Sequence, residues 1–212
     1  MNFAIPAIGL VSAAFILAQR FRRSKSTTAN DERASHRVDF DELIAGSTIN
    51  KRISSPPQIP KTSASNRTMN ANIVKREFER ANIPFGIMLG ALVNAQYESR
   101  MTAALGDDSS GAPHAFGLFQ LNTGGAGRGM SRSDMLDPVI NTQTIIQDYQ
   151  RNGSPIRSAY ETGASVATVA GLFGKYIERP ADRETTAASK RSKYARELFP
   201  SIADLPAEDL YT

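Results

Sequence analysis

The stretch PFGIMLGALVNAQYESR, residues 84–100, is apolar over most of its length and ends beside a carboxylate, Glu98. Its apolar side chains cover more than one face of a period of about 3.6 residues, so the sequence predicts a helix buried on most sides. Gly86 and Gly90 would weaken a solvated helix but allow close packing in a core. Burial would raise the pKa of Glu98, which suits a general acid. The periodicity alone favours the simpler alternative, a solvated Glu98 paired with Arg100.

A long Gly- and Ser-rich segment, residues 101–133, separates this stretch from further helical patterns. A loop of that length inside a domain usually has a function. No segment alternates with the period of a strand, apart from a small ribbon that the long loop could hold. We therefore expect a mainly α domain whose helices span residues 70–84, 84–99, 137–152, 163–178 and 186–199.

The N-terminal segment FAIPAIGLVSAAFILAQ, residues 3–19, has no charged residue and is followed at once by RFRRSK, residues 20–25. A spanning helix needs about 17–25 mostly apolar residues, so this segment predicts a single transmembrane anchor. A cleaved signal peptide has its positive charge before the apolar run, whereas here the charge comes after it. The basic flank favours a cytoplasmic position for the downstream chain. The alternative is a buried N-terminal core helix.

Residues 24–71 are rich in Ser, Thr, Asn, Lys and Pro, with SSPPQIPKTSASN (54–66) at their centre. Such a composition buries too little apolar surface to offset its ordering entropy, so it predicts a flexible tether. Within it, VDFDELIAG (38–46) predicts a short helix that ends at Gly46 and either docks on the domain or forms transiently. The predicted organisation is an anchor with its basic flank, a tether, a folded domain and a tail, at residues 1–23, 24–71, 72–200 and 201–212.

The formal net charge of +4 is unevenly distributed along the chain. Residues 1–80 hold 13 Lys and Arg against 7 Asp and Glu, whereas residues 81–212 hold 12 against 14. A nucleic-acid-binding domain needs a concentrated basic face, so we expect no nucleic-acid partner. The chain has no cysteine and 2 histidines, His36 and His114, which excludes disulfides and leaves too few ligands for a histidine- or thiolate-based metal site. We expect no metal and no cofactor.

Three further stretches follow Glu98 and Ser99 in order: AFGLFQLN at 115–122, DPVINTQTIIQDY at 137–149 and YIERPAD at 176–182. Together with the Glu-Ser pair they resemble the lysozyme-like superfamily, in particular the soluble lytic transglycosylase type and phage virion-associated cell-wall lysins. The resemblance covers roughly residues 72–180, about half of the chain. It implies a lysozyme-like catalytic fold for the mainly α domain.

The resemblance implies that Glu98 is the catalytic acid/base. It would protonate the glycosidic oxygen between N-acetylmuramic acid and N-acetylglucosamine, then take a proton from the muramic acid C6 hydroxyl as a 1,6-anhydro ring closes. Ser99 would help to organise the site by hydrogen bonding, or, in the alternative, bond back to a helix carbonyl. A lysozyme-type hydrolase would need a second carboxylate as well. Asp107 and Asp108 lie in the long loop, where turn formation is the stronger interpretation of both.

The same resemblance implies that Gly117, Phe119 and Gln120 line the sugar cleft, with Gln120 as the polar contact to substrate. Leu118 and Phe119 would serve mainly in packing. Tyr160, in the stretch AYETG, is the counterpart of a tyrosine that contacts the acid in this family. An ordinary aromatic residue at a helix end is the alternative for Tyr160.

The expected function is therefore cleavage of peptidoglycan, as a lytic transglycosylase that acts through Glu98. The expected partners are peptidoglycan glycan strands, a lipid membrane through residues 3–19, and virion proteins in a phage setting. The expected location is a virion membrane or the bacterial cell envelope. Two alternatives stay open: a lysozyme-type hydrolase of the same bond, and a non-catalytic, membrane-tethered protein that binds peptidoglycan.

Overall fold

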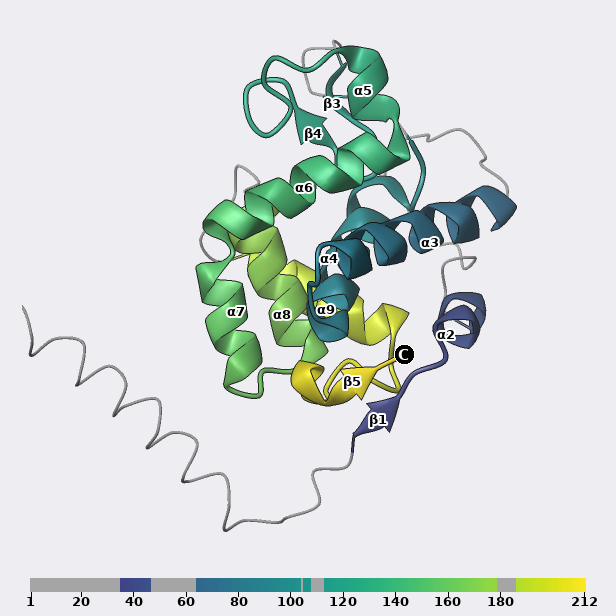
Figure 1. Ribbon diagram of the computed structural model, residues 1–212, viewed down its shortest axis with the longest axis vertical. Helices are drawn as coiled ribbons and strands as arrows, with labels where there is room; N and C mark the ends of the chain where they lie inside the picture. The colour runs from purple at the N-terminus through teal and green to yellow at the C-terminus, as the bar shows by residue number, and fades with distance from the viewer. Residues whose placement is uncertain (1–34, 47–63, 104, 108–112, 179–185) are drawn as a thin grey trace, which may run out of the picture. The chain divides into compact units, whose positions relative to one another are not determined.

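Helices dominate the computed structural model, which describes residues 35–46, 64–103, 105–107, 113–178 and 186–212. The eight α-helices in this part of the chain confirm the prediction of a mainly α fold (Figure 1). They are α2 (Phe40–Gly46), α3 (Ala64–Arg80), α4 (Phe85–Ser99), α5 (Arg132–Leu136), α6 (Pro138–Asn152), α7 (Ser154–Glu161), α8 (Val166–Phe173) and α9 (Ala187–Leu198). Short helical segments of other types are η3 (Gly174–Glu178, π-helical) and η4 (Ala207–Asp209, 3-10).

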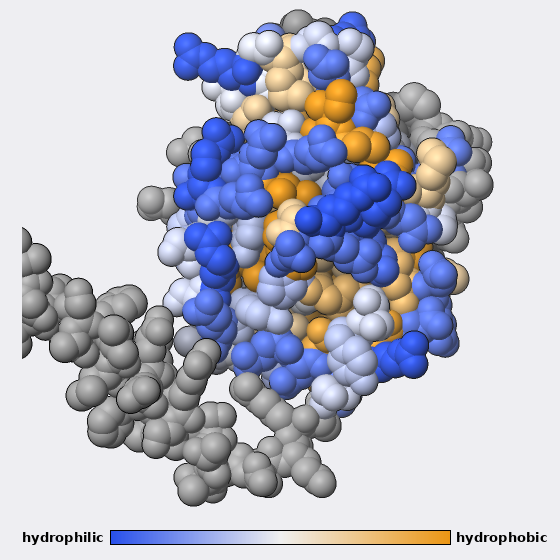
Figure 2. Space-filling model, in the orientation of Figure 1, coloured by the Kyte–Doolittle hydropathy of each residue, from blue (hydrophilic) through white to orange (hydrophobic). Residues whose placement is uncertain are grey.

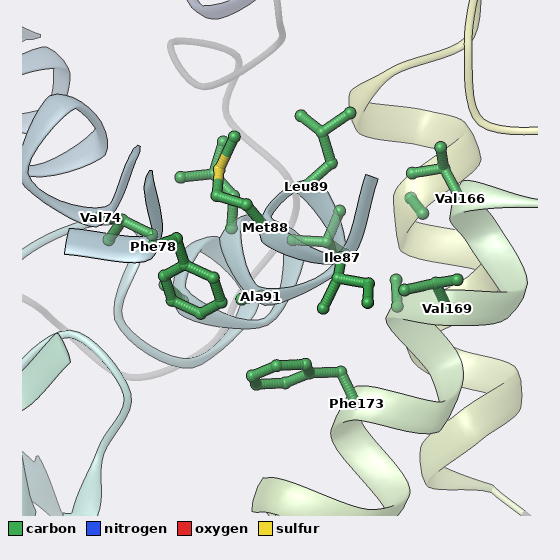
Figure 3. Packing of buried hydrophobic residues seen from close by; sticks show 14 of the residues in the cluster. Val74, Phe78, Ile87, Met88, Leu89, Ala91, Val166, Val169 and Phe173 are labelled. Atoms are coloured by element: carbon green, nitrogen blue, oxygen red, sulfur yellow. The ribbon is translucent and has the colours of Figure 1, made fainter. Parts of the chain in front are cut away.

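The buried helix predicted from the sequence is α4, which begins at Phe85 and ends at Ser99. Of its 15 residues, 12 are buried, so it runs through the core instead of lying on its surface. Phe78 of α3 and Phe173 of α8 are also fully buried in the same hydrophobic cluster (Figure 3). Full burial of a phenylalanine side chain stabilises a fold by about 1.5–3 kcal/mol. On the face drawn in Figure 2, hydrophilic residues surround small apolar areas.

Helix α4 packs closely on α8 because glycine removes the side chain at the contact. A Cβ atom added at Gly90 would lie 2.8 Å from Cγ1 of Val169. The Asn94 amide, one turn later, donates to the carbonyl of Ala170 over 3.0 Å. One turn further along η3, a Cβ atom at Gly174 would lie 2.9 Å from Oδ1 of Asn94. Gly90 and Asn94 of α4 therefore lie directly against Val169, Ala170 and Gly174.

A small antiparallel sheet forms within the long segment that follows α4. It contains β2 (Leu105–Asp107), β3 (Pro113–Phe116) and β4 (Leu121–Asn122), in the order β2-β3-β4. The sheet lies beside α5 at the top of Figure 1, on the α6 side of the helices. The predicted loop thus does contain a ribbon, and the chain turns back into helix only at Arg132.

The compact unit is longer than the predicted domain of residues 72–200, because it spans Ser35–Thr212. The short helix predicted within residues 38–46 is α2, and Val38, Phe40 and Ile44 are buried in the core. Residues 35–46 therefore belong to the folded unit and not to a tether. The predicted C-terminal tail is folded as well, since its strand β5 (Leu210–Tyr211) pairs in parallel with β1 (His36–Arg37).

No helix within the described ranges is long and apolar enough to cross a membrane. The predicted anchor, residues 3–19, lies outside the described residues, as do residues 54–63 of the Pro-rich centre of the tether. Residues 64–71, which were also assigned to the tether, instead form the first turns of α3.

Candidate active site

Glu98 lies at the C-terminal end of α4, where the chain leaves the helix through two left-handed residues. Arg100 and Met101 have φ angles of 56° and 58°, a conformation that costs a residue with a side chain about 1–2 kcal/mol. The bend is fixed from several sides: the Asn70 amide donates to the carbonyl of Met101 over 2.8 Å, and Thr102 Oγ1 donates to the carbonyl of Ser99 over 2.6 Å. The end of the helix beside Glu98 is therefore held in one conformation.

The Glu98 carboxylate forms an ion pair with Arg191 of α9, and not with Arg100 as the simpler interpretation of the sequence proposed. The Arg191 side chain is 4% exposed and the Glu98 side chain 23%. Arg191 Nε also donates to Asn94 Oδ1 over 3.0 Å, and its guanidinium carbon lies 3.5 Å from the centre of the Tyr97 ring. The sequence left open a buried Glu98 or a solvated one paired with Arg100, whereas the structure pairs Glu98 with a buried arginine of another helix.

The space for the Arg191 side chain depends on a glycine in η3. A Cβ atom added at Gly174 would lie 2.7 Å from Cγ of Arg191 and 2.9 Å from Oδ1 of Asn94. Either contact is too short, so a larger residue would move the arginine or the amide that orients it. The site thus draws on three elements that are far apart in the sequence, namely α4, η3 and α9.

Ser99 faces the core and not the solvent. Its side chain is fully buried, and Oγ donates to the carbonyl of Ala95 over 3.0 Å. This is the back-bond to a helix carbonyl that was the alternative for this serine. Ser99 therefore stabilises the helix end, and the structure does not bring its hydroxyl to a surface open to a substrate.

The predicted cleft segment, Gly117–Gln120, is a tight turn between β3 and β4 whose centre is held by Asn141 of α6. The backbone N–H of Phe119 donates to Asn141 Oδ1 over 3.0 Å. The Asn141 amide donates in turn to the carbonyls of Phe116 over 3.0 Å and Met135 over 2.7 Å. All these groups are buried, so one asparagine satisfies three buried backbone groups.

The stretch DPVIN begins α6 and has a structural role at each informative position. The Asp137 side chain accepts from the N–H groups of Val139 and Ile140 over 2.8 and 2.9 Å, which caps the helix. Pro138 follows in the first turn, where its missing N–H costs little. Asn141, one turn later, reaches the turn at Gly117–Gln120. The resemblance in sequence therefore corresponds here to a physical link between two motifs.

Gln120 is the member of the turn whose side chain stays partly accessible, while Leu118 and Phe119 are fully buried. Its amide donates to the carbonyl of Gly117 over 2.8 Å, and its backbone has a left-handed φ of 47°. Phe119 is placed for packing and not for lining an open cleft, in agreement with the packing role expected for it.

Tyr160 lies in α7, away from Glu98. Burial raises the pKa of Tyr160, and the negative charges of Glu208 and Asp209 raise it further, so its neighbours belong to η4. Segment η4 packs on the first turn of α4, because a Cβ atom at Gly86 would clash with the backbone of Ala207. Glu98 is 12 residues further along α4, which corresponds to about 18 Å. The structure therefore does not bring Tyr160 to the acid.

Sequence reasoning missed the residues that surround Glu98. Arg191 lies in AASKRSKYAREL, where nothing distinguishes it from the neighbouring Lys190 and Lys193. A second missed residue is Glu178, in the stretch YIERPAD. Glu178 ends η3, whose first residue, Gly174, packs against Asn94 and Arg191.

No group of three or more His, Asp or Glu side chains within the described ranges could hold a metal ion. Comparisons of the chain with protein-family models, with curated proteins and with solved structures found no significant match. The geometry of the site and the sequence motifs therefore have to support any functional conclusion.

Proposed function

We propose that this protein is a peptidoglycan-cleaving enzyme of lysozyme-like fold, a lytic transglycosylase whose acid/base is Glu98. The observation that carries the proposal is the Glu98 end of α4. There a partly exposed carboxylate ends an otherwise buried helix and is oriented by Arg191, a buried arginine from another helix. The turn Gly117–Gln120, locked by Asn141, supports it as a second preorganised element of the same family pattern.

In the proposed reaction Glu98 gives its proton to the oxygen between N-acetylmuramic acid and N-acetylglucosamine, and the bond from that oxygen to C1 of muramic acid breaks. The C6 hydroxyl of the muramic acid then bonds to C1 and gives its proton to the Glu98 carboxylate. The products are a 1,6-anhydromuramic end and a free N-acetylglucosamine hydroxyl. One carboxylate suffices, because it acts first as acid and then as base.

Arg191 has a defined part in this proposal. A general acid must be protonated before the bond breaks, whereas a guanidinium group stabilises the ionised carboxylate. A sugar chain that covers Glu98 excludes water from it, and that loss of solvation favours the neutral form. We infer that Arg191 orients the carboxylate in the free enzyme and that substrate binding supplies the protonated state.

The second candidate is a lysozyme-type hydrolase, which Glu178 favours. Most glycoside hydrolases need two carboxylates that flank the scissile bond. Glu178 ends η3, the segment that packs through Gly174 on Asn94 and Arg191, and a π-helical segment of this kind is a frequent feature of functional sites. Mass spectrometry of digested sacculi separates the two reactions. Anhydromuramic ends indicate a transglycosylase, whereas reducing ends that disappear in Glu178→Gln indicate a hydrolase.

The proposal includes attachment to a membrane through residues 3–19, in a virion or in the bacterial envelope. The basic residues after this segment favour a cytoplasmic folded unit, while peptidoglycan lies outside the cell membrane. Delivery by a phage particle on infection would reconcile the two. Protease accessibility of the folded unit in virions or spheroplasts tests this, because protection in both would contradict access to the wall.

Replacement of Glu98 by Gln is the direct test of the proposed function. The amide can still accept a hydrogen bond from Arg191, so we expect the fold to persist while murein solubilisation is lost. Glu77→Gln is a matched control, because Glu77 is a buried helix carboxylate that also contacts arginines, but on α3. Near-full activity of Glu98→Gln would refute the proposal. Sacculus binding without released muropeptides by the unmodified chain would favour a non-catalytic binding protein.

A further inference from the structure

Tyr97 is an exposed aromatic residue next to Glu98, and its ring is held in place. Its exposed fraction is 41%, although it lies on a helix whose residues are mostly buried. The Arg191 guanidinium packs on the ring, with 3.5 Å between the guanidinium carbon and the ring centre. The same guanidinium contacts the Glu98 carboxylate. The ring and the carboxylate therefore both contact the same planar guanidinium group.

A second tyrosine supports the ring from α9. Tyr194 makes an edge-to-face contact with Tyr97, with 5.3 Å between ring centres and 85° between ring planes. Tyr194 is itself partly buried and packs against the hydrophobic core. Arg191 and Tyr194 are three residues apart on α9, so both hold the ring from that helix. Tyr97 is consequently a rigid aromatic surface that binding would not have to order.

We propose that Tyr97 is a stacking surface for one of the two N-acetylhexosamine rings that flank the scissile bond. This inference rests on the proposed function and specifies how that site holds its substrate. The C–H groups on one side of a pyranose ring form an apolar patch that matches the face or edge of an aromatic ring, while the sugar hydroxyls remain in water. Tyrosine suits such a partly solvated position, because its ring is apolar and its hydroxyl is polar.

Exposure alone would not distinguish Tyr97, since scattered apolar side chains on a surface are ordinary. Tyr211 is 45% exposed, but it lies in β5, which directly follows η4, the segment packed on the first turn of α4. Tyr97 combines exposure with support by a buried arginine and with direct proximity to a carboxylate. Because Arg191 contacts both side chains, a sugar ring stacked on Tyr97 would lie next to the Glu98 carboxylate.

The test measures binding without turnover, in the full-length chain with Glu98→Gln. Chitohexaose, an N-acetylglucosamine hexamer, is titrated by calorimetry, and co-sedimentation with purified sacculi gives a second readout. We expect Tyr97→Ala and Tyr97→Leu to weaken binding about tenfold, a usual loss for one aromatic contact. Tyr97→Phe should bind within about twofold of the parent, because the ring and not the hydroxyl makes the contact. Tyr211→Ala is the matched control and should change nothing.

Equal affinity of Tyr97→Ala and its parent would overturn the inference, as would a loss of the same size in Tyr211→Ala. Thermal unfolding of each variant shows whether it is folded, and Tyr97→Leu keeps the apolar bulk if Tyr97→Ala does not fold. Wild-type murein solubilisation is measured in parallel. If it is present while Tyr97 variants bind normally, the stacking surface is wrong and the proposed function stands. If neither solubilisation nor binding occurs, both fail.

Discussion

The two preorganised parts of the candidate site are held by residues of opposite kinds. The turn Gly117–Gln120 is held by Asn141, a neutral amide that makes three hydrogen bonds to backbone groups. The end of α4 is held by Arg191, a charged group taken out of water. A fully satisfied neutral network is a stable way to fix a backbone, whereas burial of an ion pair costs desolvation that its attraction only partly returns.

This difference distinguishes a residue that the fold requires from residues that are proposed to act in the site. Asn141 is explained by the backbone groups that it satisfies, and it would be required whatever the protein does. The ion pair of Glu98 and Arg191 is weak evidence for stability, since well-packed apolar residues often replace such pairs without loss. We propose that this pair serves a reaction or a ligand, which is a hypothesis that variants can test.

The largest expected loss in the free energy of unfolding is at the turn Gly117–Gln120. Gly117 and Gly129 have nearly the same left-handed φ, 79° and 81°, but different surroundings. A Cβ atom at Gly117 would clash with Asn141 and with the Met135 carbonyl, whereas at Gly129 nothing lies within 4 Å. Gly129→Ala should thus lower the free energy of unfolding by about 1 kcal/mol, the cost of the conformation. Gly117→Ala should lower it by about 3 kcal/mol, because overpacking adds to that cost.

Urea denaturation of the two variants measures this difference directly, since the backbone conformation is matched and only the surroundings differ. Similar losses in both variants would mean that Asn141 does not lock the turn. A larger loss in Gly129→Ala would contradict the geometry of the turn altogether.

A smaller effect is expected at the end of α4. Arg191→Met removes the charge but keeps much of the side-chain volume, and it leaves Glu98 and Asn94 without this partner. We expect a loss of about 2 kcal/mol, less than for a fully buried pair because Glu98 is partly solvated. The double variant with Glu98→Gln should recover about 1 kcal/mol of the summed losses, since no unpaired carboxylate remains. Strict additivity of the two losses in a thermodynamic cycle would show that the groups act independently.

Most of the helical scaffold could be predicted from the sequence. The boundaries of α4 and α6 follow from Pro84, the Asp137 cap and the apolar periodicity, which are local signals. The sequence left open whether the 38–46 helix docks on the domain or forms transiently. Local patterns could not decide this, because docking depends on pairing between β1 and β5, which are far apart in the sequence. The segment that contains these residues is mainly polar in composition. Burial of Val38, Phe40 and Ile44 in the core nevertheless attaches them to the folded unit.

The candidate site was predictable only in part, for a related reason. Glu98 and Gln120 lie in motifs, and Asn141 was included in one although its role was not foreseen. Arg191 reaches Glu98 across 93 residues, and one arginine of a basic helix has no local signal of that contact. Tyr160 was predicted to contact Glu98, which is wrong. An approximate motif does not indicate which end of α4 the tyrosine lies near.

The smallest expected effect on the free energy of unfolding is at Glu77, a buried carboxylate that can be compared with Glu98. Burial of Glu77 opposes ionisation, but hydrogen bonds from Gln143 and Arg76 and the charges of Arg80 and Arg76 outweigh it, so its pKa lies below the ordinary value of 4.5. A carboxylate with a lowered pKa stabilises the fold above its unfolded pKa, and this contribution is lost as the pH falls through the folded pKa. Each unit of difference is worth about 1.4 kcal/mol.

We therefore expect the free energy of unfolding to fall on acidification below about pH 4.5, and to fall less in Glu77→Gln. Urea denaturation between about pH 6 and pH 3 measures both slopes, and parallel curves would show that Glu77 is not a source of the dependence.

The pH profile of murein cleavage should be the same in Glu77→Gln as in the wild type. Glu77 is paired with arginines of its own helix and acts on stability, whereas Glu98 is paired across the fold and is proposed to act on the reaction. A shifted activity profile in Glu77→Gln would remove that distinction.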